Sequence, residues 1–203
     1  MDQVFLLSPA RCDGARARLL LNPGATFDLA ERLRAREGAP LGEVFSFLSG
    51  LYFRGKLAYA GAFARRADST SASWIITTDR GLAPPDQRVT REDLVAFSGV
   101  DIATADERYV TPLRRDAERL AKSIGQRTRI VLLGSIATGK YADILMQVFE
   151  DRLVFPIDFV GRGDMSRGGL LLRRAREGRE LEYQPVIGAI RHGKRPPKLG
   201  RPL

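Results

Sequence analysis

The stretch Arg129-Ile-Val-Leu-Leu-Gly-Ser-Ile-Ala-Thr-Gly-Lys140-Tyr141 contains the clearest fold signal in the chain. Its first five residues form a short apolar run that predicts a buried strand, residues 134–140 predict a turn, and residues 141–149 predict a helix. Such strand-to-helix units are typical of sheets whose two faces are covered by helices. We therefore expect an α/β protein with a mainly parallel or mixed sheet flanked by helices.

Three further apolar runs predict strands at residues 4–8, 74–78 and 153–159, the last interrupted by Pro156. The segments between them predict helices, because apolar residues recur every three to four positions or because a capping residue precedes them. Gly50 and Gly55 are candidate breaks in the longest of these helices. The helices are expected at residues 15–21, 27–37, 42–63, 90–97, 111–123 and 141–149.

The composition favours one ordinary globular domain. The 203 residues are 44% hydrophobic and 28% charged, which suits one core, and the chain is too short for two ordinary domains. The only cysteine, Cys12, cannot form an intramolecular disulfide, and residues 1–7 lack the basic start of a signal peptide. Arg54 and Lys56 interrupt the most apolar stretch, which argues against a membrane span. We expect a cytoplasmic protein without membrane contact.

The net charge of the chain is +9, and much of the excess lies at the C-terminus. Residues 191–203 contain five basic residues, no acidic residue and three prolines. Such a segment buries little apolar surface, so we expect an α/β domain over residues 1–190 and a mobile tail over residues 191–203. A basic tail suits a polyanion such as nucleic acid, but it also serves solubility alone, and both interpretations stay open.

Four unusual loops each follow a predicted strand end. They span residues 8–14, 79–82, 134–140 and 161–167. Ligands of open α/β sheets bind beyond the carboxyl ends of the strands, where such loops gather. We therefore expect these loops to converge on one rim.

The loop between Gly134 and Lys140 has the spacing of a phosphate-binding P-loop. Backbone N–H groups at a helix start attract phosphate, and Ser135 and Lys140 would add polar contacts. Tyr141 stands where a Mg²⁺-binding Ser or Thr would be, and 62 residues follow it, which argues against an NTPase. An anion site without hydrolysis and a turn that needs glycine for its positive φ remain as alternatives.

Residues 161–169 form the segment richest in glycine and arginine. Its glycines allow a ligand to approach the backbone, and Arg162 and Arg167 would donate to phosphate or to a base edge. Asp164 can pair with either arginine. We favour a functional loop over a flexible surface loop.

The loop after the first strand contains Ser8, Arg11, Cys12 and Asp13. Basic neighbours can lower the pKa of a thiol, although a lone cysteine is more often inert. A Cys-His nucleophile is disfavoured because the only histidine, His192, lies in the basic tail. One His and one Cys cannot supply a usual zinc site, so we expect no metal and no cofactor.

The aromatic residues of segment 51–63 lie near Arg54 and Lys56, which would suit base stacking beside phosphate contacts. Their helical spacing is more typical of core packing, which we favour. These residues are Tyr52, Phe53, Tyr59 and Phe63.

Short motifs, taken in order along the chain, resemble those of the YaaA-like superfamily. The most specific match is Arg162-Gly163-Asp164-Met165-Ser166-Arg167, which is similar to an Arg-Gly-x-Met-Ser-Arg stretch near the family's C-terminus. The other matches are Leu6-Leu7-Ser8-Pro9-Ala10-Arg11, Leu51-Tyr52 with Tyr59-Ala60, Arg80-Gly81-Leu82 with the prolines that follow, and the segment from Ser135 to Tyr141.

The resemblance implies an α/β fold, a role in resisting oxidative damage, and DNA binding. The positions that match the family's motifs become candidate binding residues by this resemblance. They are Ser8, Arg11, Tyr141, Arg162, Met165, Ser166 and Arg167.

Two hypotheses of function follow. The first is a nucleic-acid-binding protein, with DNA as the expected partner, linked to oxidative-stress or DNA-damage protection. The alternative is a nucleotide- or nucleobase-processing enzyme in which loops 8–14, 134–140 and 161–169 form a phosphate-binding rim. Asp13 and Asp164 are then the candidate acid or base, and the catalytic residues are otherwise unknown. An interaction module without a ligand is a third possibility, and the oligomeric state is not indicated.

Overall fold

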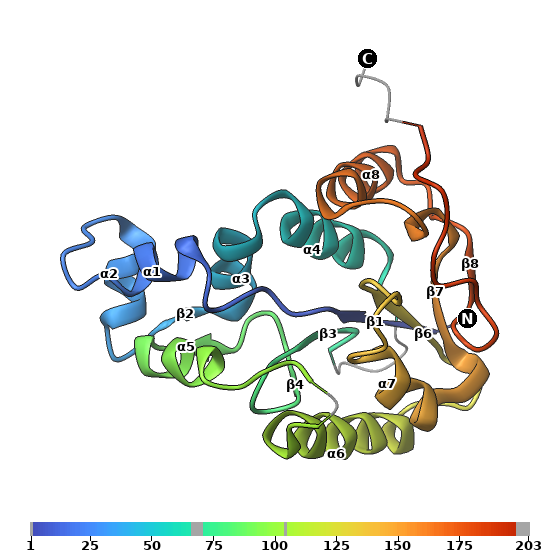
Figure 1. The fold of residues 1–203 in the computed structure, drawn as a ribbon, viewed down its shortest axis with the longest axis horizontal. Helices are drawn as coiled ribbons and strands as arrows, with labels where there is room; N and C mark the ends of the chain where they lie inside the picture. Colours follow the sequence, from blue (N-terminus) through green and yellow to red (C-terminus); the bar gives the residue numbers. More distant parts are fainter. Residues whose placement is uncertain (1, 66–70, 104, 198–203) are drawn as a thin grey trace.

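The computed structural model describes residues 2–65, 71–103 and 105–197. Most strands belong to one six-stranded sheet with the order β4-β3-β1-β6-β7-β8, and β2 and β5 form a separate ribbon (Figure 1). The strands are β1 (Gln3–Leu7), β2 (Ala39–Pro40), β3 (Ser73–Ile76), β4 (Leu82–Ala83), β5 (Arg88–Val89), β6 (Arg129–Leu133), β7 (Leu153–Pro156) and β8 (Tyr183–Pro185).

The four central strands of the sheet run parallel. β1 pairs with both β3 and β6, and β6 pairs with β7, while the edge strands β4 and β8 are antiparallel to their neighbours. Every residue of β1 is buried, as are the last four residues of β6, which fits the continuous apolar runs that predicted these strands. The prediction of a single α/β domain with a mixed sheet flanked by helices is confirmed.

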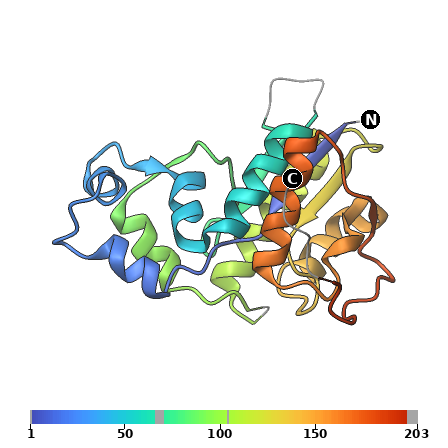
Figure 2. The ribbon, with the colours of Figure 1, turned by 90° about the horizontal axis from the view of Figure 1, so that it is seen from above.

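Helices cover both faces of the sheet. α4 and α8 lie on one face and α6 and α7 on the other, and Figure 2 shows α4 and α8 side by side. The helices are α1 (Ala15–Leu21), α2 (Asp28–Arg34), α3 (Leu41–Ser49), α4 (Leu51–Phe63), α5 (Arg91–Ser98), α6 (Glu107–Ser123), α7 (Ala142–Phe149) and α8 (Asp164–Glu177). Within the described residues, no helix has the length and apolar character needed to cross a membrane.

Glycines decide how the predicted helix over residues 42–63 is divided. Gly50 has a φ of +63°, so the chain turns there and two helices result, α3 and α4. Gly55 does not break α4. It lies where α4 meets α8, and a Cβ at this position would stand 2.6 Å from the carbonyl oxygen of Gly168. The second glycine therefore permits close helix packing.

Three predicted boundaries are corrected by the structure. The helix expected from residue 111 begins at Glu107, because Asp106 caps it by accepting from the Arg108 N–H, and Pro112 lies inside the helix. The strand expected over residues 153–159 ends at Pro156, and a 3₁₀ turn follows. The loop expected over residues 161–167 ends at Gly163, because α8 begins at Asp164.

The connections place the carboxyl ends of β1, β3 and β6 at one edge of the sheet. After β1 the chain continues to β3 on one side of it and later to β6 on the other side. Such a change of direction opens a crevice beyond the strand ends, where α/β proteins bind their ligands. The residues that follow these strands are Ser8, Thr77 and Gly134.

Candidate functional site

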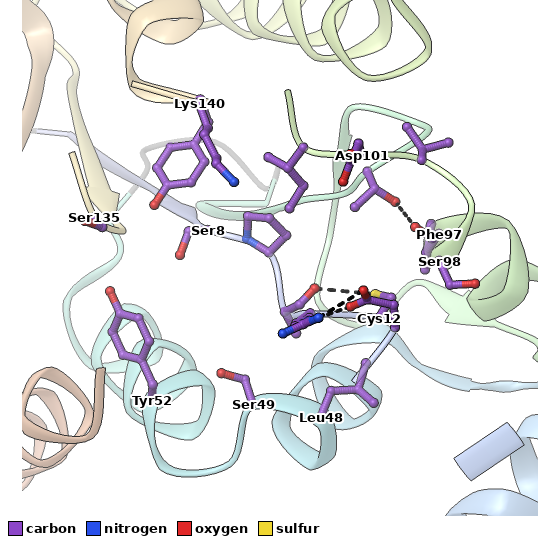
Figure 3. Close-up of a pocket in the computed structure, with 18 of the residues that line it drawn as sticks. Ser8, Cys12, Leu48, Ser49, Tyr52, Phe97, Ser98, Asp101, Ser135 and Lys140 are labelled. Carbon is purple, nitrogen blue, oxygen red and sulfur yellow. Dashed lines mark hydrogen bonds and ion pairs between the residues drawn. The ribbon is translucent and has the colours of Figure 1, made fainter. Parts of the chain in front are cut away.

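A cavity of about 550 Å³ lies beyond the carboxyl ends of β1, β3 and β6 (Figure 3). Its size is within the range of small-molecule sites. It is lined by Ser8, Pro9, Ala10, Arg11, Cys12, Asp13, Leu48, Ser49, Tyr52, Thr78, Phe97, Ser98, Val100, Asp101, Ile102, Ser135, Lys140, Tyr141 and Asp164. In Figure 3, Ser8, Tyr52, Ser135 and Lys140 lie on one side of the cavity, and Cys12, Leu48, Phe97 and Ser98 lie on the other.

Behind Ser8 lies a buried lysine. Lys56 is 1% exposed, and its Nζ lies 2.6 Å from the carbonyl oxygen of Ser8 and 2.9 Å from Ser8 Oγ. The same nitrogen stands 4.4 Å from the ring centroid of Tyr52 and 4.6 Å from that of Phe53. Burial lowers the pKa of Lys56 to about 7, although Asp164 opposes this shift. A substantial fraction of Lys56 is therefore an uncharged amine near neutral pH.

Two tyrosines stand beside Ser8. Burial raises the pKa of Tyr141 to about 12, and hydrogen bonds with the Ser8 side chain and the Ser135 backbone limit this shift. Burial also raises the pKa of Tyr52, and the nearby Arg167 limits this shift, although the Tyr52 hydroxyl has no hydrogen bond of full geometry among the described residues. Both phenols are therefore neutral hydrogen-bond donors at physiological pH.

Gly134 explains how these side chains come so close. A Cβ at this position would lie 2.7 Å from the Tyr141 hydroxyl and 2.8 Å from Ser8 Cβ, so any larger residue would separate them. Gly134 ends the strand that runs beside β1, which brings the two strand ends together. The residue therefore matters for packing at the site.

The opposite wall of the cavity is largely apolar. Leu48 comes from α3, Phe97 from α5, and Val100 and Ile102 from the segment after α5. Leu48 and Phe97 are buried, so their positions are set by core packing. Only Val100 and Ile102 of these four residues are partly exposed, so they provide the apolar contact that this wall offers to a ligand.

Charged side chains occur at the rim. Arg11 is exposed and paired with Asp13, with 2.6 Å between Arg11 Nε and Asp13 Oδ1. The hydrogen bond from Arg11 lowers the pKa of Asp13, which keeps this carboxyl ionised. Lys140 is exposed, and Figure 3 shows its amine directed toward the cavity. The lining therefore combines two cations, Arg11 and Lys140, with the carboxylates of Asp13, Asp101 and Asp164.

Most of the predicted site residues line this cavity. Three of the four predicted loops contribute, and Thr78 lies just before the fourth. The predicted residues in its lining are Ser8, Arg11, Asp13, Ser135, Lys140, Tyr141 and Asp164, while Gly134 lies against Ser8 and Tyr141.

Two predicted arginines, Arg162 and Arg167, are absent from the lining of this cavity. Arg167 is 8% exposed, and its Nε and Nη2 donate to the carbonyl oxygen of Phe159 at 3.2 and 3.0 Å. Arg162 and Ser166 line a second cavity of about 320 Å³, next to the C-terminal segment, together with Gly163, Met165, Arg195, Pro196 and Pro197.

The loop over residues 134–140 differs from a P-loop in detail. α7 starts two residues after Lys140, at Ala142, and Asp143 in its first turn pairs with Arg191 at 2.5 Å. Gly139 has a φ of +68°, as expected for a turn that needs glycine. The Asp143 carboxylate therefore lies in the first turn of α7, where a P-loop would bind phosphate. The residues of this loop that line the cavity are Ser135 and Lys140.

Cys12 is not an activated thiol. Its side chain is buried, and its Sγ donates to the carbonyl oxygen of Ala10. Burial, with the charges of Asp13 and Asp79, raises the pKa of Cys12 to about 12. In addition, the part of the chain that the structure describes contains no group of three His, Cys, Asp or Glu residues placed to hold a metal ion.

The contact between Lys56 and Ser8 was missed at the sequence level. A signal existed, since Lys56 falls three and four residues after Phe53 and Tyr52 and three and four residues before Tyr59 and Ala60. A lysine on the apolar face of a helix has to be buried or displaced, and here it is buried. No pattern in the sequence indicated that Leu48, Phe97, Val100 and Ile102 would lie together at the cavity.

Comparisons of the chain with protein-family models, with curated proteins and with solved structures found no match. The resemblance to the YaaA-like superfamily therefore stays a prediction, and the evidence on function comes from the cavity itself.

Proposed function

We propose that this protein is an enzyme that processes a nucleotide- or nucleobase-like small molecule in the cavity beyond β1 and β6. The observation that carries the proposal is the contact of Lys56 with Ser8 at the cavity floor, because a buried amine 2.9 Å from a hydroxyl is typical of a reactive centre. Perturbed groups in a concave site are a general mark of catalysis.

The side chains that line the cavity suggest the class of ligand. The partly exposed apolar side chains of Val100 and Ile102 suit a heterocycle, and Lys140 at the rim suits an attached phosphate. Neutral donors on the floor, Tyr52 and Tyr141, suit the carbonyl or ring nitrogen atoms of a nucleobase.

A thermal-shift panel of nucleobases, nucleosides and mononucleotides tests the proposal. A ligand at about 100 times its Kd should stabilise the protein by about 2.7 kcal/mol. Lys140→Ala should remove the advantage of mononucleotides over nucleosides, and Lys122→Ala, an exposed lysine on α6, should leave it unchanged. Absence of any stabilisation by the whole panel would contradict the proposal.

Nucleic-acid binding is a second candidate, supported by the exposed Lys194 and Arg195 of the C-terminal segment. Arg191, in the same C-terminal segment, is paired with Asp143. The test is fluorescence anisotropy of labelled duplex and single-stranded DNA with the full chain and with a chain that ends at Ile190. Binding that depends on the tail should weaken and show a smaller salt slope after truncation. Equal binding by the two chains would exclude the tail.

A further inference from the structure

The environment of Lys56 favours its neutral form. Among the described residues, no carboxylate lies within ion-pair distance of its Nζ. The charged or titratable groups around it are Tyr52 on α4, Asp164 and Arg167 on α8, and Tyr141, which contacts the same Ser8 side chain. Burial without a counter-ion disfavours an ammonium group, and Arg167 adds to this effect, while Asp164 and the faces of the Tyr52 and Phe53 rings favour the charged form.

The two contacts of the amine have different consequences. A hydrogen bond to the Ser8 carbonyl oxygen at 2.6 Å fixes the end of β1. The second contact, at 2.9 Å, joins Nζ to the side-chain oxygen of a residue that lines the cavity. In its neutral form the amine can donate to the carbonyl and accept the Ser8 hydroxyl proton at the same time. The geometry is that of a nucleophile with its general base.

Tyr52 supplies a second and independent indication of a ligand. Its side chain is 5% exposed and lines the cavity beside Ser8 (Figure 3), and its hydroxyl has no hydrogen bond of full geometry within the described chain, while the nearby Arg167 limits the rise in its pKa. A buried hydroxyl without a partner is costly unless a ligand satisfies it. Tyr52 and Tyr141 both keep their hydroxyl protons at physiological pH, so each can donate a hydrogen bond to an oxyanion.

We propose that Ser8 is the nucleophile of an acyl-transfer reaction, with Lys56 as its general base and the Tyr52 hydroxyl as an oxyanion donor. The inference rests on the proposed function in using the same cavity, and it specifies the substrate as a molecule with an amide or ester carbonyl. Lys56 Nζ contacts Ser8 Oγ, and Ser8 and Tyr52 both line the cavity.

The reaction has two stages, acylation and deacylation of Ser8. Ser8 Oγ forms a bond to the carbonyl carbon while its proton passes to Lys56 Nζ, and the carbonyl oxygen becomes an oxyanion that Tyr52 hydrogen-bonds. The bond to the leaving amine or alcohol then breaks, and Lys56 returns the proton to that group. Water attacks the acyl-serine, Lys56 accepts its proton, and Ser8 Oγ leaves with that proton. The net reaction is hydrolysis of the amide or ester.

An alkyl fluorophosphonate probe tests the nucleophile directly. Ser8 Oγ should bond to phosphorus and displace fluoride, so mass spectrometry should show one adduct on the peptide that contains Ser8. The cavity serines that lack a lysine partner are internal controls. They are Ser49, Ser98 and Ser135. An adduct on one of these serines, or none on the folded protein, would overturn the proposal.

Variants and pH separate catalysis from structure. Ser8→Ala keeps the backbone carbonyl that Lys56 binds and should abolish labelling. Lys56→Met should slow it by about 100-fold or more. Tyr52→Phe keeps the ring and should slow it by about 100-fold. In the unmodified protein the rate should rise with pH and level off above about 7, the pKa of Lys56. A rate that does not change between pH 6 and 9 would show that Lys56 is not the base.

The two proposals fail in different ways. Labelling of Ser8 without stabilisation by any nucleotide or nucleobase would reject the ligand class and keep the acyl-transfer centre. Stabilisation by such a ligand without labelling of Ser8 would reject the acyl-transfer centre and keep the binding function.

Discussion

Helix α4 and the segment over residues 161–169 pack against each other, and each contributes both to this packing and to the lining of the cavity, through Tyr52 and Asp164. The segment rich in glycine and arginine looks like a ligand loop, yet Arg167 binds a backbone carbonyl and Gly168 packs against Leu51. The aromatic helix looks like core, yet it brings Tyr52 to the cavity and Lys56 to Ser8. Burial of a polar group with few partners therefore indicates function better than the local density of charge.

The largest expected effect extends this comparison to Cys12, a polar residue whose basic neighbours suggest reactivity. Because burial raises its pKa to about 12 from an ordinary value near 9, its thiolate fraction at pH 8 should be about a thousandfold below that of the unfolded chain. Alkylation by iodoacetamide, followed by mass spectrometry with and without denaturant, measures the ratio. Equal rates in the two conditions would show that Cys12 is accessible and ionised.

Packing of α4 against α8 can be tested with two glycines of one helix. Gly55→Ala would place a Cβ 2.6 Å from the Gly168 carbonyl oxygen and should lower the free energy of unfolding by about 1–3 kcal/mol. Gly61→Ala meets no atom within 4 Å and should raise it by about 0.5–1 kcal/mol. Urea denaturation of both variants gives the values. Similar effects of the two substitutions would contradict the close approach of the helices.

The smallest expected effect is a slope of stability with pH. The pKa of Lys56 is lowered to about 7 in the folded chain and is near 10.5 in the unfolded chain, so the unfolded chain binds more protons between these values. This group should make the free energy of unfolding rise with pH by up to about 1.4 kcal/mol per unit between pH 7.5 and 8.5. Lys56→Met should remove this contribution, and Lys122→Met should retain it.

The sequence was sufficient for the four parallel strands and for the edge where their loops meet, because short buried runs mark central strands. It did not indicate the short edge strands β4 and β8. The helix over residues 164–177 was missed because Gly168 and Gly169 suggest a loop. Only contact with α4 shows that Gly168 permits close packing. The Ser8–Lys56 contact joins residues 48 positions apart, which no local pattern encodes.

The most direct test of the central claim is the pKa of Lys56 itself, measured by NMR on protein with isotope-labelled lysine. The chain has five lysines, and Lys56→Met identifies the signal. We expect the Lys56 side chain to titrate near pH 7 and the signal to shift in Ser8→Ala, which removes one partner of the amine. Titration near pH 10.5, the ordinary value for lysine, would show a charged amine and contradict its role as the base at Ser8.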